Sequence, residues 1–428
     1  MGRDFTEQMV KDKSLEYVLR RGVAEIIVEQ ELVRLLESGK RLRLKMGFDP
    51  SRADIHLGHV VGMRKLRQFQ ELGHQVVLII GDWTAQIGDP TGASQTRPML
   101  SAEEVGANAK TYMEQFFKVV DRDRTELRWQ TEWYGEFDLA KVIWLTSKFT
   151  VAQLLAREDF AKRHAAGRPI AITELLYPLL QAYDSVAVEA DVEFGGIDQK
   201  FNCLMGRELQ QIVGQTAQHV FFMPLLVGTD GRQKMSKSLD NYISIEEPPA
   251  DMYGKVMSIP DDLMMDYFEL LTDVPDKELA EFRQQLSVVS VNPMIWKKRL
   301  AREIVGQFHG ADGVGRGEEY FEKTVQGREE PDHMPQFLFS EDAQLRYSAS
   351  SNMIVPRTLS PSELISSTGL ASSRAEAKRL ISQGAVKMNR RKLADDTPIN
   401  LTDNDVFQVG KLRWSRAVDA DKNPSGGD

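Results

Sequence analysis

The pattern of apolar residues in residues 42–80 places the strongest constraint on how this chain folds. Apolar side chains alternate with basic ones in residues 42–48, which is the period of a half-buried strand. They recur at helical spacing in residues 56–69, and residues 76–80 are an unbroken apolar run, typical of a fully buried strand. This order predicts a right-handed βαβ unit with parallel strands, the beginning of a nucleotide-binding α/β fold.

The loop after the second strand is the first candidate ligand site. Residues 81–92 are rich in turn formers, among them Asp82, Gly88 and Asp89. Ligands of open parallel sheets bind beyond the carboxyl ends of the strands, which is where this loop begins. The later pattern continues the sheet, with predicted helices at 102–120, 150–166, 172–186 and 201–213 and predicted strands at 191–194 and 220–227.

Length and composition limit the class of protein. The chain has 428 residues, enough for about three domains. Its single cysteine, Cys203, excludes a disulfide within the chain and a cysteine-based zinc site, and it favours a reducing compartment. The apolar runs are too short to span a bilayer, and residues 3–21 are too charged for a secretory signal, so we expect neither.

The charge is acidic overall but basic near one end. The formal net charge of −9 argues against a wholly basic nucleic-acid binder. Residues 374–392 reverse the balance with seven basic residues against one acidic residue, on a predicted helix (374–383) and a following strand (386–388). One basic module in an acidic chain predicts a local contact with a polyanion.

His56 and His59 lie three residues apart at the start of the predicted helix 56–69. A helix N-terminus favours phosphate because its backbone N–H groups are unpaired and its dipole is positive there. Gly58, between the two histidines, would let a ligand approach the backbone closely. Two alternatives stay open for this motif alone: a zinc-binding pair, which lacks a third ligand nearby, and two ordinary surface histidines.

The sequence KMSKS at residues 234–238 is a second candidate phosphate site. Lys234, Ser236 and Lys237 could close over a polyphosphate and neutralise the charge that develops at its α-phosphate. An ordinary solvated basic loop is the alternative. This loop and the histidine pair both follow strand ends of one predicted sheet, which favours the phosphate interpretation for both.

Tyr177, Gln181 and Asp184 are spaced four and three residues apart on the predicted helix 172–186. They therefore project in one line as a phenol, an amide and a carboxylate. Beside the apolar stripe of this helix, the amide and the carboxylate are anomalous unless they bind a ligand, although both could also be solvated. The line is a candidate recognition surface.

Together these motifs resemble the class I aminoacyl-tRNA synthetases, whose two signatures match HLGH at 56–59 and KMSKS at 234–238. Further stretches are similar to the tyrosyl-tRNA synthetase family: GFDP at 47–50, IGDP at 87–90, YPLLQAYD at 177–184 and GGIDQ at 195–199. Near the C-terminus, SRAEAKRLI at 373–381 resembles an S4 RNA-binding domain. The resemblance covers nearly the whole chain.

The resemblance implies the domain organisation. We expect an α/β fold with a Rossmann-type parallel-sheet catalytic domain and its helical insertion, then a helical anticodon-binding domain, then a small α+β S4-like RNA-binding domain. The predicted boundaries of these three domains are 1–248, 249–340 and 359–420, with a linker at 341–358 and a disordered tail at 421–428.

The resemblance also implies a reaction: L-tyrosine and ATP give tyrosyl-adenylate and pyrophosphate, and tyrosine then passes to the 3′-terminal ribose of tRNA(Tyr). The implied catalytic residues, which act by positioning and charge, are His56, His59, Lys234 and Lys237. Implied ATP-binding residues are Gly47, Asp49, Gly58, Gly196, Asp198, Ser236 and Lys237, and implied tyrosine-binding residues are Asp89, Tyr177, Gln181, Asp184 and Gln199. Asp184 would accept the phenolic hydroxyl. Mg²⁺ would accompany ATP, with no tightly bound protein metal.

The basic C-terminal module is implied to bind tRNA through shape and phosphate contacts. The residues that would do so are Arg374, Lys378, Arg379, Arg390, Arg391 and Lys392. The resemblance further implies a homodimer in the cytoplasm, without membrane association.

One position departs from the family pattern. Many members carry a tyrosine four residues before the aspartate of GFDP, where this chain has Lys45. The second hydrogen bond to the substrate hydroxyl therefore lacks an obvious donor, and Asp184 needs help from another group. Two other functions stay open: a tryptophanyl-tRNA synthetase, against which Asp184 and the S4-like tail argue, and an RNA-binding protein without catalysis, against which the intact signatures argue.

Overall fold

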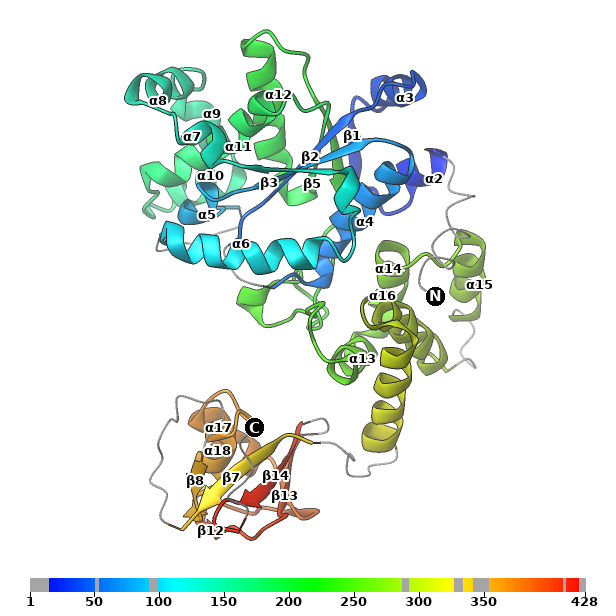
Figure 1. Cartoon of the computed structure of the whole chain (residues 1–428), viewed down its shortest axis with the longest axis vertical. Helices are drawn as coiled ribbons and strands as arrows, with labels where there is room; N and C mark the ends of the chain where they lie inside the picture. The colour runs from blue at the N-terminus through cyan, green and yellow to red at the C-terminus, as the bar shows by residue number, and fades with distance from the viewer. Residues whose placement is uncertain are drawn as a thin grey trace. The chain divides into compact units, whose positions relative to one another are not determined.

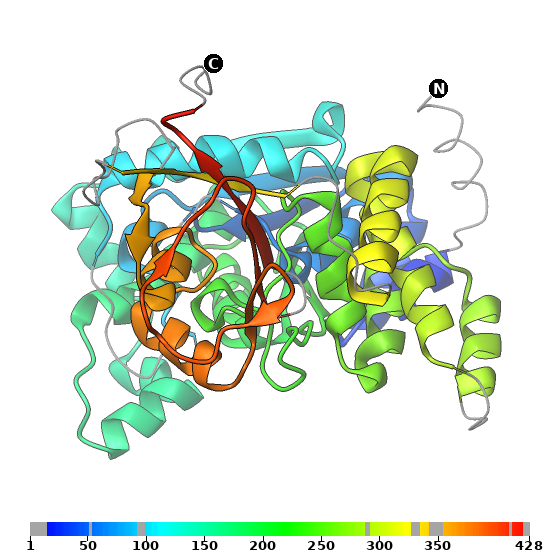
Figure 2. The ribbon, with the colours of Figure 1, turned by 90° about the horizontal axis from the view of Figure 1, so that it is seen from below.

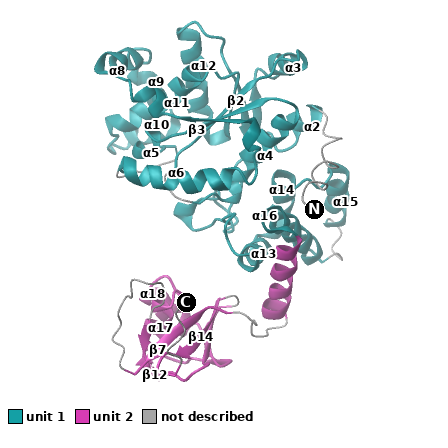
Figure 3. Ribbon diagram, viewed as in Figure 1, with its two compact units in different colours: residues 1–310 teal, residues 311–428 magenta. Residues whose placement is uncertain are grey.

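The computed structural model describes residues 15–50, 54–91, 99–286, 292–326, 334–341, 354–410 and 413–422. They form two compact units, residues 1–310 and 311–428 (Figure 3). The boundary lies inside helix α16 (Met294–Phe321), where Gly310 has the non-helical angles φ 65° and ψ −172°. Most of the predicted linker and most of the predicted tail lie outside the described residues.

Unit 1 is built on a six-stranded sheet in the order β1-β6-β5-β2-β3-β4. Its strands are β1 (Glu25–Ile27), β2 (Arg43–Phe48), β3 (Gln75–Ile80), β4 (Thr125–Trp129), β5 (Val192–Gly196) and β6 (His219–Met223). Neighbours from β6 to β4 run parallel, which confirms the predicted α/β fold, whereas the edge strand β1 is antiparallel to β6. The sequence did not predict β1, because its three residues are too few to display a period.

Helices cover both faces of this sheet (Figure 1). Helix α4 (Leu57–Glu71) connects β2 to β3, and α12 (Lys200–Ile212) connects β5 to β6. From the centre of the sheet these two connections run in opposite directions, so right-handed crossovers place α4 and α12 on opposite faces. The strand order reverses between β2 and β5, and ligands of such sheets bind beyond the carboxyl ends of the strands at this point.

The predicted βαβ unit is present with nearly the predicted bounds. Helix α4 buries Val60, Met63, Leu66 and Phe69, which is the helical spacing of the sequence. It ends just before Gly73, whose φ of +99° is open to glycine and strained for other residues. Strand β3 is buried throughout except at its first residue, as its unbroken apolar run predicts.

The connections from β3 to β5 carry the remaining helices around the sheet. These are α5 (Thr84–Ile87), α6 (Ala102–Phe116), α7 (Thr131–Tyr134), α8 (Leu139–Thr146), α9 (Val151–Leu155), α10 (Glu158–Ala165) and α11 (Ile172–Ala187). The single helix predicted at 150–166 is wrong, because the helical conformation is interrupted between α9 and α10. Arg157 is extended there, and its guanidinium donates hydrogen bonds to Asp159 and Asn202.

Further helices complete unit 1 at the two ends of its chain. Helices α2 (Leu15–Arg20) and α3 (Glu29–Glu37) precede the sheet, and α13 (Pro249–Ser258), α14 (Met264–Leu271), α15 (Asp276–Leu286) and the first part of α16 follow it. None of the helices in the described ranges combines the length and the apolar composition that crossing a membrane requires.

Unit 2 has a second sheet in the order β11-β10-β13-β14-β7-β8, with α17 (Pro361–Ser367) and α18 (Arg374–Ser382) beside one face (Figure 2). The strands of unit 2 are β7 (Gln336–Ser340), β8 (Ile354–Pro356), β10 (Val386–Met388), β11 (Arg391–Lys392), β13 (Val406–Val409) and β14 (Arg413–Asp419), with a separate pair β9 (Thr358–Leu359) and β12 (Ile399–Asn400). Leu364 and Ile381 of the helices and Phe339 and Phe407 of the sheet share one core.

Two strands of this second sheet correct the sequence analysis. The pattern assigned residues 336–340 to the helical domain and residues 354–356 to the linker. In the structure β7 pairs with β14, and β8 pairs with β7. Since β14 comes far later in the chain than β7, no local pattern could reveal this pairing.

Candidate active site

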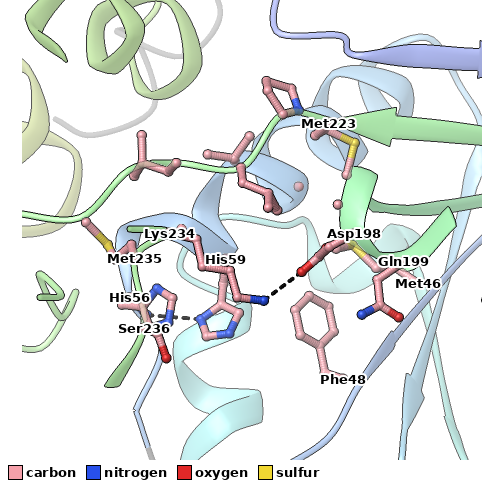
Figure 4. Close-up of a pocket in the computed structure, with 17 residues that line it drawn as sticks. Met46, Phe48, His56, His59, Asp198, Gln199, Met223, Lys234, Met235 and Ser236 are labelled. Carbon is pink, nitrogen blue, oxygen red and sulfur yellow. Dashed lines mark hydrogen bonds and ion pairs between the residues drawn. The ribbon is translucent and has the colours of Figure 1, made fainter. Parts of the chain in front are cut away.

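Two adjoining cavities, each of about 300 Å³, lie beyond the carboxyl ends of the central strands of unit 1. The residues that line the first cavity include His56, Gly58, His59, Gly196, Asp198, Gln199, Lys234 and Ser236 (Figure 4). Those of the second include Gly47, Asp49, His59, Thr84, Asp89, Gln130, Tyr177, Gln181, Asp184, Glu193, Gly196 and Gln199. His59, Gly196 and Gln199 line both cavities, so the two cavities meet at these residues.

The hydrogen-bond geometry of the two histidines at the start of α4 fixes where His59 carries its ring proton. The Nδ1 of His59 accepts a hydrogen bond from the backbone N–H of His56 at 3.3 Å. That bond leaves the proton of a neutral His59 ring on Nε2, where a ligand can accept it. The two rings lie 3.9 Å apart between centroids. Gly58 makes room for them, since a Cβ on it would lie 3.0 Å from the His56 ring.

Both imidazoles are neutral at physiological pH. Burial, with smaller contributions from the ammonium charges of Lys237 and Lys234, lowers the pKa of His59 to about 3. The pKa of His56 is also lowered, first by burial and then by His59 and the two lysines. The histidines can therefore act as hydrogen-bond donors, while the lysines supply the positive charge.

The loop at residues 234–238 reaches across the first cavity. Lys234 Nζ lies 2.7 Å from Asp198 Oδ2 (Figure 4). The backbone N–H of Ser236 donates to Asn241 Oδ1 at 2.8 Å, which anchors the middle of the loop. Lys237 lies in the short turn Lys237–Leu239 and lines neither cavity. It is the single predicted active-site residue that the structure does not bring to the cavities.

Asp184 closes one end of the second cavity. It is 3% exposed and accepts hydrogen bonds from Gln130 Nε2 at 2.8 Å and from Trp133 Nε1 at 3.1 Å. Burial raises the pKa of Asp184 to about 7, although the charge of Lys45 and these hydrogen bonds oppose the rise. A carboxylate in this environment gains from a further donor such as a hydroxyl group.

Two more carboxylates lie at the other end of this cavity. Asp49 accepts hydrogen bonds from Tyr177 OH at 2.8 Å and from Thr84 Oγ1 at 2.7 Å. Asp89 accepts one from Gln199 Nε2 at 2.7 Å. The sequence analysis assigned Asp49 to ATP, but the structure places it in the second cavity and not among the residues that line the first. Paired carboxylates at this end suit a cation such as an ammonium group.

Lys45, the departure from the family pattern, is buried, and its ammonium group is bonded to other residues of the protein. The parallel register of β2 and β5 places it opposite Glu193. Its Nζ lies 2.8 Å from Glu193 Oε1, 2.7 Å from Ser185 Oγ and 3.0 Å from the carbonyl oxygen of Gln181. Since an ammonium has three donors, these acceptors use all of them, and Lys45 has none left for a ligand.

Sequence reasoning missed three polar residues that line the second cavity, Thr84, Gln130 and Glu193, and it missed Trp133, which donates a hydrogen bond to Asp184. Gln130 directly follows β4, and Trp133 lies in the next helix, α7; the sequence analysis did not predict β4. The rule that ligands bind beyond strand ends would have selected them, as it selected residues 81–92. Only four of the five residues of β4, Glu126 to Trp129, alternate between charged and apolar, which is a short run from which to identify a strand.

The raised pKa of Asp49 predicts that this carboxylate, when ionised, destabilises the fold. Burial raises its pKa from 3.8 to about 7, and the charge of Asp89 adds to the rise. The folded chain therefore holds this proton more tightly than the unfolded chain, so this group lowers the free energy of unfolding as the pH rises from about 4 to 7.

Asp49→Asn, which keeps the shape and the two hydroxyl partners, is expected to raise the free energy of unfolding by about 2 kcal/mol at pH 8. The gain should shrink to less than half at pH 5, where the wild-type carboxyl is largely protonated. Urea unfolding at both pH values measures it. An equal gain at pH 5 and pH 8 would show that ionisation of Asp49 is not the cause.

The predicted tRNA-binding residues all lie in unit 2, and some of them have acidic neighbours. Arg374 forms an ion pair with Glu363 at 2.8 Å, and Lys378 lies 3.9 Å from Asp396. Arg379, Arg390, Arg391 and Lys392 are exposed side chains on α18 and on the turn and strand of β11. Exposed arginine and lysine side chains are suited to phosphate contacts.

Comparison with known proteins identifies the class. The family described as tRNA synthetases class I (W and Y) matches residues 37–326, and the S4 domain family matches residues 363–395. A solved structure of a C-terminally truncated mitochondrial tyrosyl-tRNA synthetase from Aspergillus nidulans has a TM-score of 0.61 at 21% identity, over 76% of this chain and 99% of that chain. A tryptophanyl-tRNA synthetase from Plasmodium falciparum has a TM-score of 0.57 at 17% identity, over 74% of this chain and 90% of that chain, so the fold alone does not choose between the two amino acids. The chain belongs to the class I tRNA synthetases of the tryptophan and tyrosine group.

Closer relatives narrow the assignment within that class. A tyrosine–tRNA ligase of Dehalococcoides mccartyi (strain CBDB1) is 57% identical over 408 residues, which cover 95% of this chain and 99% of the relative. A tyrosine–tRNA ligase of Thermotoga maritima is 48% identical over 400 residues, 93% of this chain and 96% of the relative. The family within the class is thus that of the tyrosine–tRNA ligases, as the sequence motifs predicted.

Proposed function

We propose that the first cavity binds ATP and the second binds L-tyrosine, so that the tyrosine carboxylate meets the α-phosphate where the cavities join. As a tyrosine–tRNA ligase, the chain activates L-tyrosine with ATP and transfers it to the 3′-terminal ribose of tRNA(Tyr). The observation that supports this placement is that the second cavity has polar groups at both of its ends. Asp49 and Asp89 suit the ammonium of the substrate, and Asp184 suits its phenol.

The chemistry needs no protein nucleophile. A carboxylate oxygen of tyrosine attacks the α-phosphorus, and the bond to pyrophosphate breaks with its electron pair. His59 and His56 donate hydrogen bonds to the phosphate oxygens, while Lys234 and Lys237 stabilise the charge that develops there. A ribose hydroxyl of tRNA then attacks the carbonyl carbon of the adenylate, and AMP leaves.

Binding of ATP replaces the ion pair between Lys234 and Asp198. The two side chains are 45% and 22% exposed, and exposed ion pairs contribute only about 0–1 kcal/mol. Asp198 then accepts hydrogen bonds from the ribose hydroxyls, and Lys234 turns to the phosphates. The same loop movement brings Lys237 to the first cavity. Ser236 and Gly196 complete the nucleotide contacts.

The remaining ligand assignments follow the two ends of the second cavity. Tyr177, with Asp49 and Asp89, surrounds the substrate ammonium, and Gln181 and Gln199 lie along the substrate between its ends. ATP enters as its Mg²⁺ complex, since Mg²⁺ keeps phosphate and water oxygens as ligands. The cytoplasm is the proposed compartment, because tRNA charging supplies translation there.

ATP–pyrophosphate exchange without tRNA tests this function. Tyrosine, phenylalanine and tryptophan are compared at equal concentration, and tyrosine alone is expected to support exchange. Exchange driven by tryptophan would reassign the second cavity to the sister synthetases. A folded protein that exchanges with none of the three would leave RNA binding as the function.

A homodimer is proposed for the assembly, with a second copy covering exposed apolar side chains of α8 and its surroundings. Leu139, Ile143 and Val151 are 73%, 60% and 62% exposed, and Val142 and Trp144 lie beside them. Contiguous apolar surface of this kind marks an interface with another protein.

Ile143→Glu is expected to shift the chain from dimer to monomer, because burying an unpaired carboxylate in an apolar interface costs several kcal/mol. Light scattering after size exclusion measures the mass. Glu136→Lys, also on an exposed side chain but outside the apolar group, is the control and should leave the mass unchanged. An Ile143→Glu variant that keeps the dimer mass would refute this interface.

The S4-like module is proposed to hold tRNA by its phosphates. Replacing Arg391 and Lys392 by alanine is expected to lower the salt dependence of tRNA binding by roughly 1.5 in the slope of log K against log salt, about 0.7–0.9 for each lost contact. Adenylate formation should be unchanged, because both residues belong to unit 2. Filter binding between 50 and 200 mM salt measures the slope; an unaltered slope would exclude both side chains from phosphate contact.

A further inference from the structure

The phenolic hydroxyl of a substrate in the second cavity can make two kinds of hydrogen bond, one as donor and one as acceptor, and Asp184 is a partner for only one of them. The phenolic O–H donates its proton to a carboxylate, but the phenolic oxygen also accepts. Its natural partner is a neutral or cationic donor beside Asp184. Lys45 is excluded, because its three donors are bound to Glu193, Ser185 and Gln181.

Gln130 lies directly beside Asp184 and has a fixed orientation. Its Oε1 accepts hydrogen bonds from the backbone N–H groups of Trp83 at 3.1 Å and Thr84 at 3.0 Å. The opposite side of the amide, Nε2, donates to Asp184 Oδ2 at 2.8 Å. These contacts determine which atom of the amide is nitrogen, since an exchange of O and N would set donors against donors.

One N–H of Gln130 is left over. The amide nitrogen carries two hydrogens, and Asp184 takes one of them. Among the described residues, no acceptor is bound to the second. The side chain is 1% exposed and lines the same cavity as Asp184, so bulk water is a poor partner for this hydrogen. A buried donor without a partner costs about as much as a lost hydrogen bond, which a bound substrate can recover.

The other donors near Asp184 are already used. Trp133 Nε1–H donates to Asp184, and Tyr134 OH donates to the carbonyl oxygen of Leu180 at 2.6 Å. The amide of Gln181 donates to Glu193 Oε1 at 3.1 Å and approaches Cys203 Sγ at 3.9 Å. Gln130 is therefore the best-placed donor at the Asp184 end.

We propose that Gln130 is a specificity residue for tyrosine: its second N–H donates to the phenolic oxygen of the substrate while Asp184 accepts the phenolic proton. This inference rests on the proposed placement of the phenol at Asp184. Gln130 thus makes the second hydrogen bond to the substrate hydroxyl, which Lys45 cannot make. Phenylalanine would leave both the amide and the carboxylate without this partner.

The test compares tyrosine with 4-aminophenylalanine in ATP–pyrophosphate exchange. The arylamine donates to Asp184 as the phenol does, but its nitrogen is a poor acceptor, so it cannot use the donor of Gln130. Gln130→Met is expected to lower the ratio of kcat/KM for tyrosine to that for 4-aminophenylalanine by about 10- to 100-fold. Gln130→Glu, which in its protonated form keeps the acceptor for Trp83 and Thr84 and loses only the second N–H, is expected to lower it as well.

Trp133→Phe separates this role from mere positioning of Asp184. It also removes one hydrogen bond to the carboxylate, at 3.1 Å, but leaves Gln130 intact. It should slow exchange with both substrates and preserve their ratio. An equal fall of the ratio in the Trp133 variant, or an unchanged ratio in both Gln130 variants, would overturn the proposal. Failure of the phenol placement itself is detected separately, as an unaltered tyrosine-to-phenylalanine ratio in Asp184→Ala.

Discussion

His59→Ala is expected to slow tyrosyl-adenylate formation by about 10²- to 10³-fold, the usual loss when one donor to a developing oxyanion is removed. The affinity for tyrosine should change little, because the proposed placement gives the ammonium and the phenol to other residues. The physical reason lies in the ring: Nδ1 accepts from the backbone N–H of His56, which leaves Nε2–H as the group that can donate to the phosphates of the proposed ATP site. Single-turnover adenylation and equilibrium tyrosine binding measure the two quantities.

Two further variants at this position test the roles of the two ring nitrogens separately. His59→Asn can keep an acceptor near the position of Nδ1 and so preserve the contact with His56, but its side chain is too short to place a donor at the position of Nε2. His59→Gln reaches the position of Nε2 with an amide N–H and should retain more of the adenylation rate. An alanine variant that loses tyrosine affinity and adenylation rate equally, or an asparagine variant that outperforms glutamine, would remove His59 from the proposed role.

The same geometry predicts a flat pH dependence for this group. Since burial and the neighbouring lysines lower the pKa of His59 to about 3, the ring stays neutral from pH 5 to 8. Protonation of this histidine should therefore leave no inflection in the adenylation rate over that range.

Asp184→Ala is expected to narrow the preference for tyrosine over phenylalanine by about 10- to 100-fold, because a hydrogen bond to a buried charged group contributes roughly 1.5–3 kcal/mol. The ratio of kcat/KM for the two amino acids in pyrophosphate exchange measures it. Exchange with phenylalanine should not fall in proportion to exchange with tyrosine, since phenylalanine makes no hydrogen bond there.

Asp184→Asn is the matched variant for shape. Its amide oxygen can accept from Gln130 or from Trp133, as the carboxylate does, but it lacks the negative charge. It should lose much of the selectivity while it keeps the packing of the cavity. If Asp184→Ala leaves the ratio of tyrosine to phenylalanine unchanged, the group that recognises the hydroxyl lies elsewhere.

Sequence reasoning succeeded where the chemistry lies in short contiguous motifs. The histidine pair follows a strand whose period is visible in the sequence, and it caps a helix whose apolar stripe is also visible. Tyr177, Gln181 and Asp184 share one helix, so their common direction follows from helical spacing alone. For these residues the local pattern was sufficient, and the cavities contain them all.

Sequence reasoning failed where two segments that are far apart in the chain pack together. Lys45 could not be interpreted until the register of β2 and β5 placed it opposite Glu193. Gln130 was missed because the strand before it was not predicted and because its partners Trp83, Thr84 and Asp184 lie on two other segments of the chain.

The sequence by itself determined the class of fold, the two phosphate signatures and the recognition helix, because each follows from the period or the spacing of residues that are close together in the chain. The tertiary structure decided the division of the site into two cavities, the burial that raises the pKa of Asp49 and Asp184, and the hydrogen bonds that orient Gln130. These depend on strand order and on desolvation. Both arise only when segments far apart in the chain pack together and exclude water.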